Sequence, residues 1–162
     1  MVYHGRLQRD LQKLQVSSTK IITLVAKNLA KVGFKFIHEG EAEECSKCPL
    51  RKVCIEKLSK KRIYEVVRVR RRRHQCPVHG EVVVVEVTYS SIDAVIERKY
   101  AIEGIIVKYN PIDCEENCIY RRLCQPEGLI KGDKVKIEKL LGDIDCPRGL
   151  RLVKAQLYPL IT

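Results

Sequence analysis

Short runs in which apolar and polar residues alternate recur along the whole chain, and they predict β-strands. A period of two and many β-branched residues are typical of strands that bury one face. Leu7, Leu11 and Leu14 instead have helical spacing, so we expect one short helix near the N-terminus of a mainly β protein. The predicted strands are IITLVA (21–26), FKFI (34–37), RIYEVVRVR (62–70), EVVVVEVTY (81–89), IDAVIERKY (92–100), IIVKY (105–109), KVKIEKLL (134–141) and LRLVKAQLY (150–158).

The eight cysteines form two sets with nearly the same spacing. Cys45-x2-Cys48-x5-Cys54-x21-Cys76 is followed by Cys114-x3-Cys118-x5-Cys124-x21-Cys146. A basic pair lies between the second and third cysteine of each set, and proline follows each fourth cysteine. This pattern predicts an internal repeat of small barrel-like, pseudo-symmetric units. We expect an extension at residues 1–19, a first repeat at 20–89 and a second repeat at 90–162.

The cysteines predict a stabilising site in each repeat. A unit this small buries little apolar surface, and small domains commonly add a metal ion or a covalent staple. In a reducing cytosol the staple is metal rather than disulfide. The Lys and Glu content is similar to that of heat-adapted organisms, whose cytosolic proteins can carry disulfides, so disulfides stay an alternative.

Four thiolates can hold either one [4Fe–4S] cluster or one tetrahedral zinc ion. Structural zinc sites usually join two C-x2-C hooks, whereas this chain has only one. The C-x2-C-x5-C run resembles the cluster loop of iron–sulfur DNA-repair glycosylases and nucleases, which take their fourth cysteine from upstream. We expect two [4Fe–4S] clusters, with two zinc ions as the alternative. His74 and His79, on either side of Cys76, could replace a cysteine as a zinc ligand.

The positive charge is concentrated in the first repeat. The chain has a net charge of +11, and residues 20–89 contain 16 basic and 8 acidic residues, against 12 and 11 in residues 90–162. Such an excess favours an anionic partner, and it indicates that the first repeat carries the binding surface. The repeated basic pairs, Arg51-Lys52 and Arg121-Arg122, could contact phosphate or could neutralise a negatively charged metal site.

A run of arginines follows in the first repeat, with five basic residues in the six positions 68–73. In a regular strand Arg68, Arg70 and Arg72 would share one face, about 6–7 Å apart, which is close to the phosphate spacing of a nucleic acid. A solvated edge strand that resists aggregation is the alternative. The expected nucleic-acid-binding residues are Arg51, Lys52, Lys60, Lys61, Arg62, Arg68, Arg70, Arg71, Arg72 and Arg73.

Structured RNA is favoured over DNA as the partner, either alone or within a larger ribonucleoprotein assembly. Aromatic residues make up 6% of the chain and tryptophan is absent, which argues against a stacking platform for single strands. Recognition of phosphates and 2′-hydroxyls on a folded surface needs charge more than aromatic rings. The alternative function is a two-cluster electron-transfer protein, or an accessory subunit of a redox or RNA-modifying enzyme.

Signatures of catalysis and of membrane insertion are missing from the sequence. It contains no Gly-rich phosphate loop, no H-E-x-x-H and no G-x-S-x-G, so we lean against an enzyme. Asp93, Glu97 and Lys99 resemble a nuclease motif, but they are too close together to lie on two strands. The apolar runs are too short to span a membrane and the N-terminus is too polar for a secretory signal, so we expect a cytoplasmic protein.

Several segments together resemble one protein family. The likeness to the archaeal uncharacterised protein family 0179 is carried by ITLVAKNLAKVGFKFIHEGEAEECSKCPLRKVC, RIYEVVRV, CPVHGEVVVVEV and the second cysteine set. It runs from near residue 20 to the end of the chain. The resemblance implies an archaeal, cytosolic protein with eight metal-type cysteines, and it implies no activity. Residues 1–19 extend beyond the usual start of the family.

Overall fold

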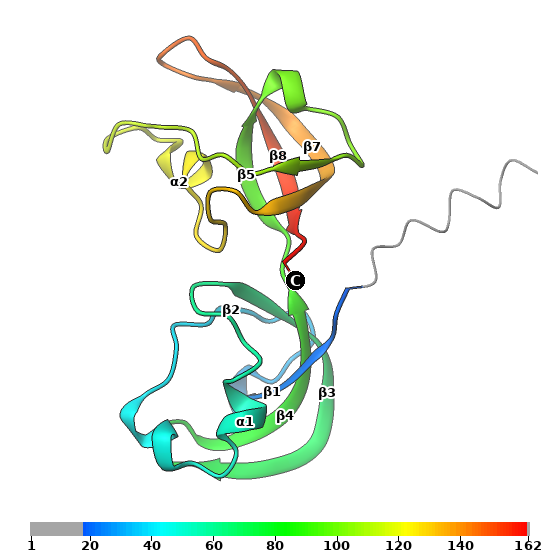
Figure 1. The fold of residues 1–162 in the computed structure, drawn as a ribbon, viewed down its shortest axis with the longest axis vertical. Coiled ribbons are helices and arrows are strands. Elements are labelled where there is room, and N and C mark those ends of the chain that lie inside the picture. Colours follow the sequence, from blue (N-terminus) through cyan, green and yellow to red (C-terminus); the bar gives the residue numbers. More distant parts are fainter. Residues whose placement is uncertain (1–17, 162) are drawn as a thin grey trace, which may run out of the picture.

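Two four-stranded antiparallel sheets make up the computed structural model, which describes residues 18–161 (Figure 1). The first sheet has the order β1-β4-β3-β2 and consists of β1 (Ile21–Ala26), β2 (Lys35–Ile37), β3 (Ile63–Cys76) and β4 (Gly80–Tyr89). The second sheet has the order β5-β8-β7-β6 and consists of β5 (Ile92–Glu97), β6 (Ile106–Lys108), β7 (Lys134–Asp145) and β8 (Arg151–Pro159). Both sheets are curved, and one curls into a half-barrel.

The helices are short and lie between the strands. Three are 3-10 helices, η1 (Lys27–Leu29), η2 (Glu43–Lys47) and η3 (Arg98–Tyr100), and two are single α-helical turns, α1 (Arg51–Cys54) and α2 (Arg121–Cys124). The prediction of a mainly β protein is confirmed, and each of the eight expected segments contains a strand, although the segment 92–100 continues after Glu97 as η3. The helix expected around Leu7, Leu11 and Leu14 lies outside the described residues. No helix within residues 18–161 is long and apolar enough to cross a membrane.

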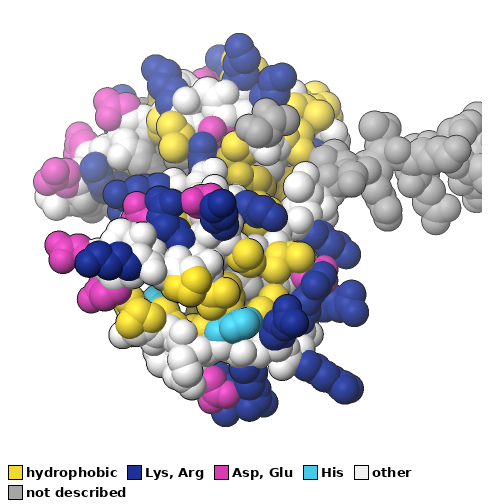
Figure 2. Space-filling view, turned by 60° about the horizontal axis from the view of Figure 1, so that its bottom comes forward, with side chains coloured by type: hydrophobic (Ala, Val, Ile, Leu, Met, Phe, Trp, Pro, Cys, Tyr) yellow, Lys and Arg dark blue, Asp and Glu magenta, His cyan; other side chains and the backbone are white. Residues whose placement is uncertain are grey.

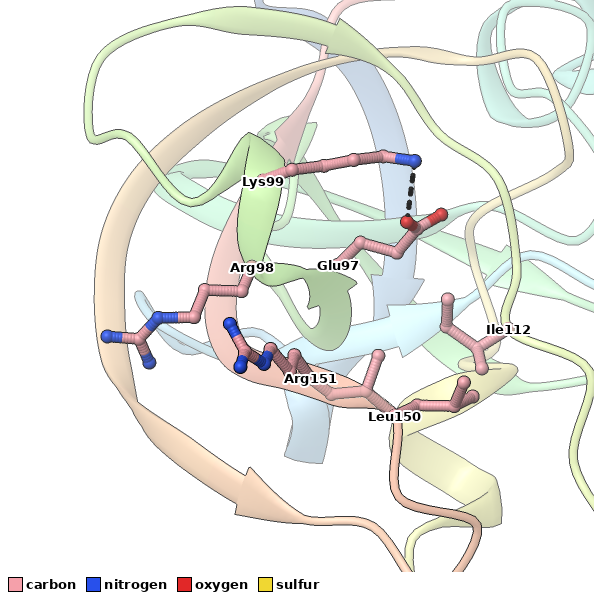
Figure 3. A pocket seen from close by; sticks show the side chains of 7 residues that line it. Glu97, Arg98, Lys99, Ile112, Leu150 and Arg151 are labelled. Carbon is pink, nitrogen blue, oxygen red and sulfur yellow. Dashed lines mark ion pairs between the residues drawn. The ribbon is translucent and has the colours of Figure 1, made fainter.

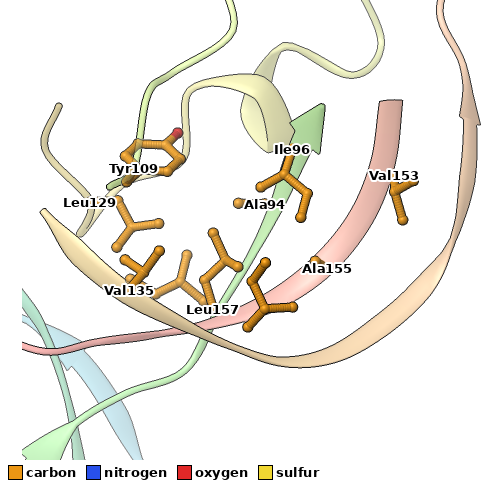
Figure 4. Close-up of a cluster of buried hydrophobic side chains, with 10 residues drawn as sticks. Ala94, Ile96, Tyr109, Leu129, Val135, Val153, Ala155 and Leu157 are labelled. Carbon is orange, nitrogen blue, oxygen red and sulfur yellow. The ribbon is translucent and has the colours of Figure 1, made fainter. Parts of the chain in front are cut away.

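Alternation along the strands sets the core of each half. In the second half Ala94, Val135, Ile137, Ala155 and Leu157 are fully buried, as their spacing of two on β5, β7 and β8 requires (Figure 4). Tyr109 and Leu129, from the segments before and after α2, point into the same space.

The core of the first half is smaller and includes a row of aromatic rings. Its fully buried members are Tyr64, Val66, Val85 and Val87. The ring of Tyr64 lies 5.0 Å from that of Tyr89 and 6.0 Å from that of Phe36, centroid to centroid. These separations are in the range in which aromatic pairs attract each other beyond their buried area.

Strand β3 does not keep the regular alternation that we expected of it. Its pairing with β4 shifts between Val66 and Arg68 and again between Val69 and Arg73. Val69 pairs with Val85 and Arg73 pairs with Val83, so the three residues Arg70–Arg72 lie opposite the single residue Val84. The regular alternation from which we predicted that Arg68, Arg70 and Arg72 share one face is therefore interrupted, although Arg68 and Arg70 both reach the carboxylate of Glu86.

Polar contacts and close packing join the two halves. Arg62 Nη2 donates to Asp133 Oδ1 (2.9 Å), and Arg62 Nη1 donates both to Asp133 Oδ2 and to the carbonyl oxygen of Gly128 (3.0 Å). The hydroxyl groups of Thr88 and Tyr158 lie 2.9 Å apart. The side chain of Arg62 retains 9% of its surface and that of Asp133 retains 12%, so this ion pair is buried.

Candidate metal centres and basic surface

The first cysteine set lies where the short helices meet the end of the long hairpin. Cys45 is in η2, Cys48 follows η2, Cys54 ends α1 and Cys76 ends β3. Burial raises the pKa of the Cys54 thiol, and the nearby Cys76, Cys45 and Cys48 raise it further. Cys76 is thus an electrostatic neighbour of Cys54, and the two side chains pack against the same cluster of buried residues.

The second cysteine set surrounds a cavity of about 230 Å³. All four members line it: Cys114, Cys118, Cys124 and Cys146. Burial raises the pKa of the Cys124 thiol to about 12, with further contributions from the other three cysteines. Four thiols this close oppose one another's ionisation, and a bound cation would reverse that effect because metal ligation favours the thiolate.

The thiols gather without adopting the arrangement of a bound ion. Among residues 18–161 no three His, Cys, Asp or Glu side chains are placed as in a metal-ion site, and all eight cysteines are free thiols. The arrangement of a bound zinc ion would require the four sulfurs to lie about 3.8 Å from one another, at the corners of a tetrahedron. In the second half all four cysteines line one cavity, and in the first half Cys54 has the other three cysteines as electrostatic neighbours.

The backbone around the third cysteine of each set is fixed by a hydrogen bond from the sheet side. Thr23 Oγ1 donates to the carbonyl oxygen of Cys54 (2.7 Å), and Tyr109 Oη donates to that of Cys124 (3.3 Å). Composition and spacing gave no sign of either contact. Both donors are buried, so each contact ties its short α-helical turn to the core.

In each repeated basic pair the first residue, Arg51 or Arg121, is half-buried, and the second, Lys52 or Arg122, is exposed. Arg51 bonds Glu41 (Nε to Oε2, 2.7 Å) and Glu56 (Nη1 to Oε1, 2.6 Å), and Arg121 Nη1 donates to the carbonyl oxygen of Cys114 (2.8 Å). These two arginines therefore order the cysteine loops. Within the described part of the chain, Lys52 forms no ion pair, which leaves it available to a partner.

The histidines occupy different surroundings. His79 is exposed and, with Cys45 and Cys54, lines a cavity of about 520 Å³ in the first half. His74 lies within β3 opposite Val82. His38 lines the same cavity as His79, and burial lowers the pKa of its imidazole.

The arginine run of β3 is partly paired with acids on β4. Arg70 bonds Glu86 through Nε (3.0 Å) and Nη2 (2.8 Å), Arg68 lies 3.7 Å from the same carboxylate, and Arg73 bonds Glu81 (3.2 Å). The hydrogen bond from Arg70 lowers the pKa of Glu86. Arg71 and Arg72 are exposed, and neither forms an ion pair with any described residue.

The remaining basic candidates are less uniform. Lys61 pairs with Glu39 on the surface, and Lys60 lies against Gly40. Arg62 is buried against Asp133, so it does not belong to an exposed binding surface. In the face that Figure 2 shows, Lys and Arg side chains lie along the right edge, at the top and across the middle, around an apolar area that contains a histidine.

Comparison with known proteins confirms the family resemblance that the sequence indicated. The model of the Uncharacterised protein family (UPF0179) matches residues 21–157. The chain belongs to this family. The UPF0179 protein of Thermococcus onnurineus is 44% identical over 144 residues, covering 87% of this chain and 96% of the relative. That of Methanocaldococcus jannaschii is 41% identical over 142 residues, covering 86% and 94%. No solved structure is significantly similar.

Proposed function

We propose that this UPF0179 protein binds structured RNA through its first half, and that four cysteines in each half hold a metal centre. The observation that supports the binding surface best is the bulge of β3. It displays Arg71 and Arg72 without a carboxylate partner among the described residues, beside arginines that are only partly neutralised. Exposed guanidinium groups without internal partners are free to bind phosphate in a bidentate manner.

The proposal includes an internal repeat with pseudo-twofold symmetry. Apart from η2, which has no counterpart in the second half, both halves run through their elements in the same order. Matching hydrogen bonds also recur, such as His38 N–H to Arg62 O and Tyr109 N–H to Asp133 O. Matching residues also meet across the interface, since Arg62 contacts Asp133 and Thr88 contacts Tyr158. In a twofold interface only residues on the axis contact their own equivalents, and these two pairs fit that position.

The proposed metal centres are [4Fe–4S] clusters, with zinc as the alternative. Both groups accept four thiolates and leave no open position. The cavity that Cys114, Cys118, Cys124 and Cys146 surround in the second half favours the larger group. Each centre would link the turn before α1 or α2 to the tip of the long hairpin, which supplies the fourth cysteine. That link would stabilise small cores such as that of the first half.

Structured RNA is the proposed partner because the basic surface is not an aromatic one. The described aromatic rings of the first half, Phe34, Phe36, Tyr64 and Tyr89, pack against one another or against its core, which leaves little ring surface for stacking on bases. Recognition would then rest on phosphates and 2′-hydroxyls, either in a free RNA or in a ribonucleoprotein assembly. Free thiols suit a reducing compartment, so we propose a cytoplasmic location.

The test is binding of a folded RNA hairpin and of duplex DNA of the same length, measured over a range of salt concentrations. The proposal expects tighter binding to the RNA and an affinity that falls steeply as salt rises. Equal, salt-independent affinities would exclude it.

A further inference from the structure

A hollow of about 600 Å³ in the second half has no place in the proposed function so far (Figure 3). Its walls carry three cations, Arg98, Lys99 and Arg151, and a single acid, Glu97. Its remaining lining is apolar and consists of Ile112, Leu150 and Leu152. The volume is within the usual range for sites that bind small molecules.

The same position in the first half carries an ion pair. There Lys27 follows β1 and Glu81 precedes Val82 on β4, and their side chains bond at 2.8 Å. In the second half Arg98 follows β5 and Arg151 precedes Leu152 on β8. The pairings Ala26 with Val82 and Glu97 with Leu152 show that these positions match. Two cations therefore occur where the first half has a cation and an acid.

The acids near the hollow leave part of this positive charge free. Lys99 Nζ bonds Glu97 Oε2 (2.7 Å), so these two groups neutralise each other. Arg98 uses Nη1 to bond Asp143, which leaves its Nη2 and Nε donors free. Within the described residues Arg151 forms no ion pair. Figure 3 shows the guanidinium groups of Arg98 and Arg151 at one end of the hollow, with Ile112 and Leu150 at the other.

This arrangement matches a ligand with an anionic end and an apolar body. Guanidinium groups bind phosphate oxygens in a bidentate manner, and two of them can share one phosphate. Leu150 retains 40% of its surface, so an apolar or planar group could cover it. We infer that the hollow binds a phosphate monoester with a planar body, in the class of nucleoside monophosphates. The phosphate lies between Arg98 and Arg151, and the body lies on Ile112 and Leu150.

The test is calorimetric titration of the full chain with adenosine monophosphate, with inorganic phosphate and with adenosine. The inference expects the monophosphate to bind at least about tenfold more tightly than either part alone, since each part makes only half of the contacts. Equal binding of the monophosphate and inorganic phosphate would overturn it, and so would absence of monophosphate binding.

The variant Arg151→Glu separates this site from general charge. It recreates the Lys27–Glu81 arrangement of the first half, so the variant is expected to fold, as its circular dichroism would verify. It should weaken monophosphate binding by about tenfold or more. Lys131→Glu makes the same change in net charge on the exposed surface and should change binding less than about twofold. Equal losses in both variants would contradict the inference, and Arg151→Gln repeats the test should Arg151→Glu not fold.

Discussion

Arg62 and Asp133 form a buried bidentate ion pair between the two halves, and they hold matching positions in them. Each accepts, through its carbonyl oxygen, a hydrogen bond from the residue after a short strand, His38 in one half and Tyr109 in the other. Two identical charges at this point would repel each other. The cation on one half and the acid on the other instead attract each other across the interface.

Breaking this pair should destabilise the fold strongly. Arg62→Ala leaves the Asp133 carboxylate buried without its partner, and removal of one member of a buried pair costs about 3–5 kcal/mol. We expect the free energy of unfolding in guanidinium chloride to fall by this order. The double variant Arg62→Leu/Asp133→Leu removes both charges, and it should be more stable than the single variant.

The matched control is an exposed pair, Lys27 with Glu81, whose side chains retain 51% and 33% of their surface. Exposed pairs contribute about 0–1 kcal/mol, so Lys27→Ala should change stability little. If Arg62→Ala and Lys27→Ala cost the same, the buried pair does not hold the halves together.

Gly128 should tolerate no side chain at the same interface. A Cβ there would lie 2.7 Å from Ile92 Cδ1 and 2.9 Å from Ile63 Cγ1, and the φ angle of +89° already disfavours other residues. We expect Gly128→Ala to lower the free energy of unfolding by about 2–4 kcal/mol, from strain plus overpacking. Gly132 has a similar φ of +93° with nothing within 4 Å of the added Cβ. Gly132→Ala isolates the backbone contribution, and equal losses would exclude overpacking at Gly128.

Local sequence patterns predicted much of this fold and little of the pairing between side chains. Most of the strands follow from period-two alternation, because one face of each packs against the core, and β4 follows from a continuous β-branched run that is buried on both faces. The bulge at Arg70–Arg72 was not foreseen, because a bulge depends on the partner strand and leaves the composition unchanged. The burial of Arg62 was missed for a similar reason. Its partner Asp133 lies 71 positions away, in the other half.

The approach of the fourth cysteine to the short helices was easier to predict than the pairing of charged side chains around the cysteines. Cys76 and Cys146 end or follow the first long strand of each hairpin, and that strand carries them back to the short helices. The x21 spacing between the third and fourth cysteine of each set already predicts this return of the chain. Glu41, which pairs with Arg51, is close to it in sequence, and Glu86, which pairs with Arg70, lies across one hairpin. The sequence does not predict these pairs, because many lysines and arginines compete for fewer acids. The sequence therefore identified the basic region, but it did not predict which Lys and Arg side chains lack an acidic partner.

Arg71 and Arg72 should contribute more to RNA binding than the paired arginines beside them. We expect Arg71→Ala/Arg72→Ala to weaken binding of an RNA hairpin by about tenfold at low salt. The slope of log K against log salt should fall by about 1–2, because up to two phosphate contacts are lost. Fluorescence anisotropy across a salt series measures both quantities.

The control for that experiment removes two cations from the other half. Arg122→Ala/Lys131→Ala lowers the net charge by the same amount, and neither residue belongs to the first half. An equal loss of affinity in both double variants would mean that net charge, and not the bulge of β3, attracts the RNA.

Alkaline pH should destabilise the first half through Tyr64. The residue is fully buried, its hydroxyl accepts a hydrogen bond from Ser59 N–H (2.8 Å), and burial raises its pKa to about 12. Below pH 10 the phenol is protonated in both states, so its contribution is complete. Between pH 10 and about 12 the unfolded chain releases this proton and the folded chain keeps it, so the free energy of unfolding decreases.

Chemical unfolding at pH 8, 10 and 11 checks this behaviour. Tyr64→Phe should lose about 1 kcal/mol at pH 8 with the hydrogen bond, and should decline less steeply above pH 10 than the unchanged protein. Tyr100→Phe, at a residue that retains 47% of its surface, is the control for removal of an exposed phenol. Parallel declines in the Tyr64 variant and the unchanged protein would show that other groups cause the alkaline loss.

Metal content after anaerobic purification tests the central claim that each half closes around its own four-cysteine centre. Elemental analysis and an absorption spectrum should give about eight iron atoms in a brown protein, or about two zinc atoms in a colourless one. Cys54→Ser and Cys124→Ser should each remove about half of the metal, because each variant breaks one centre. A protein that binds neither metal, or single variants that keep the full content, would contradict the account.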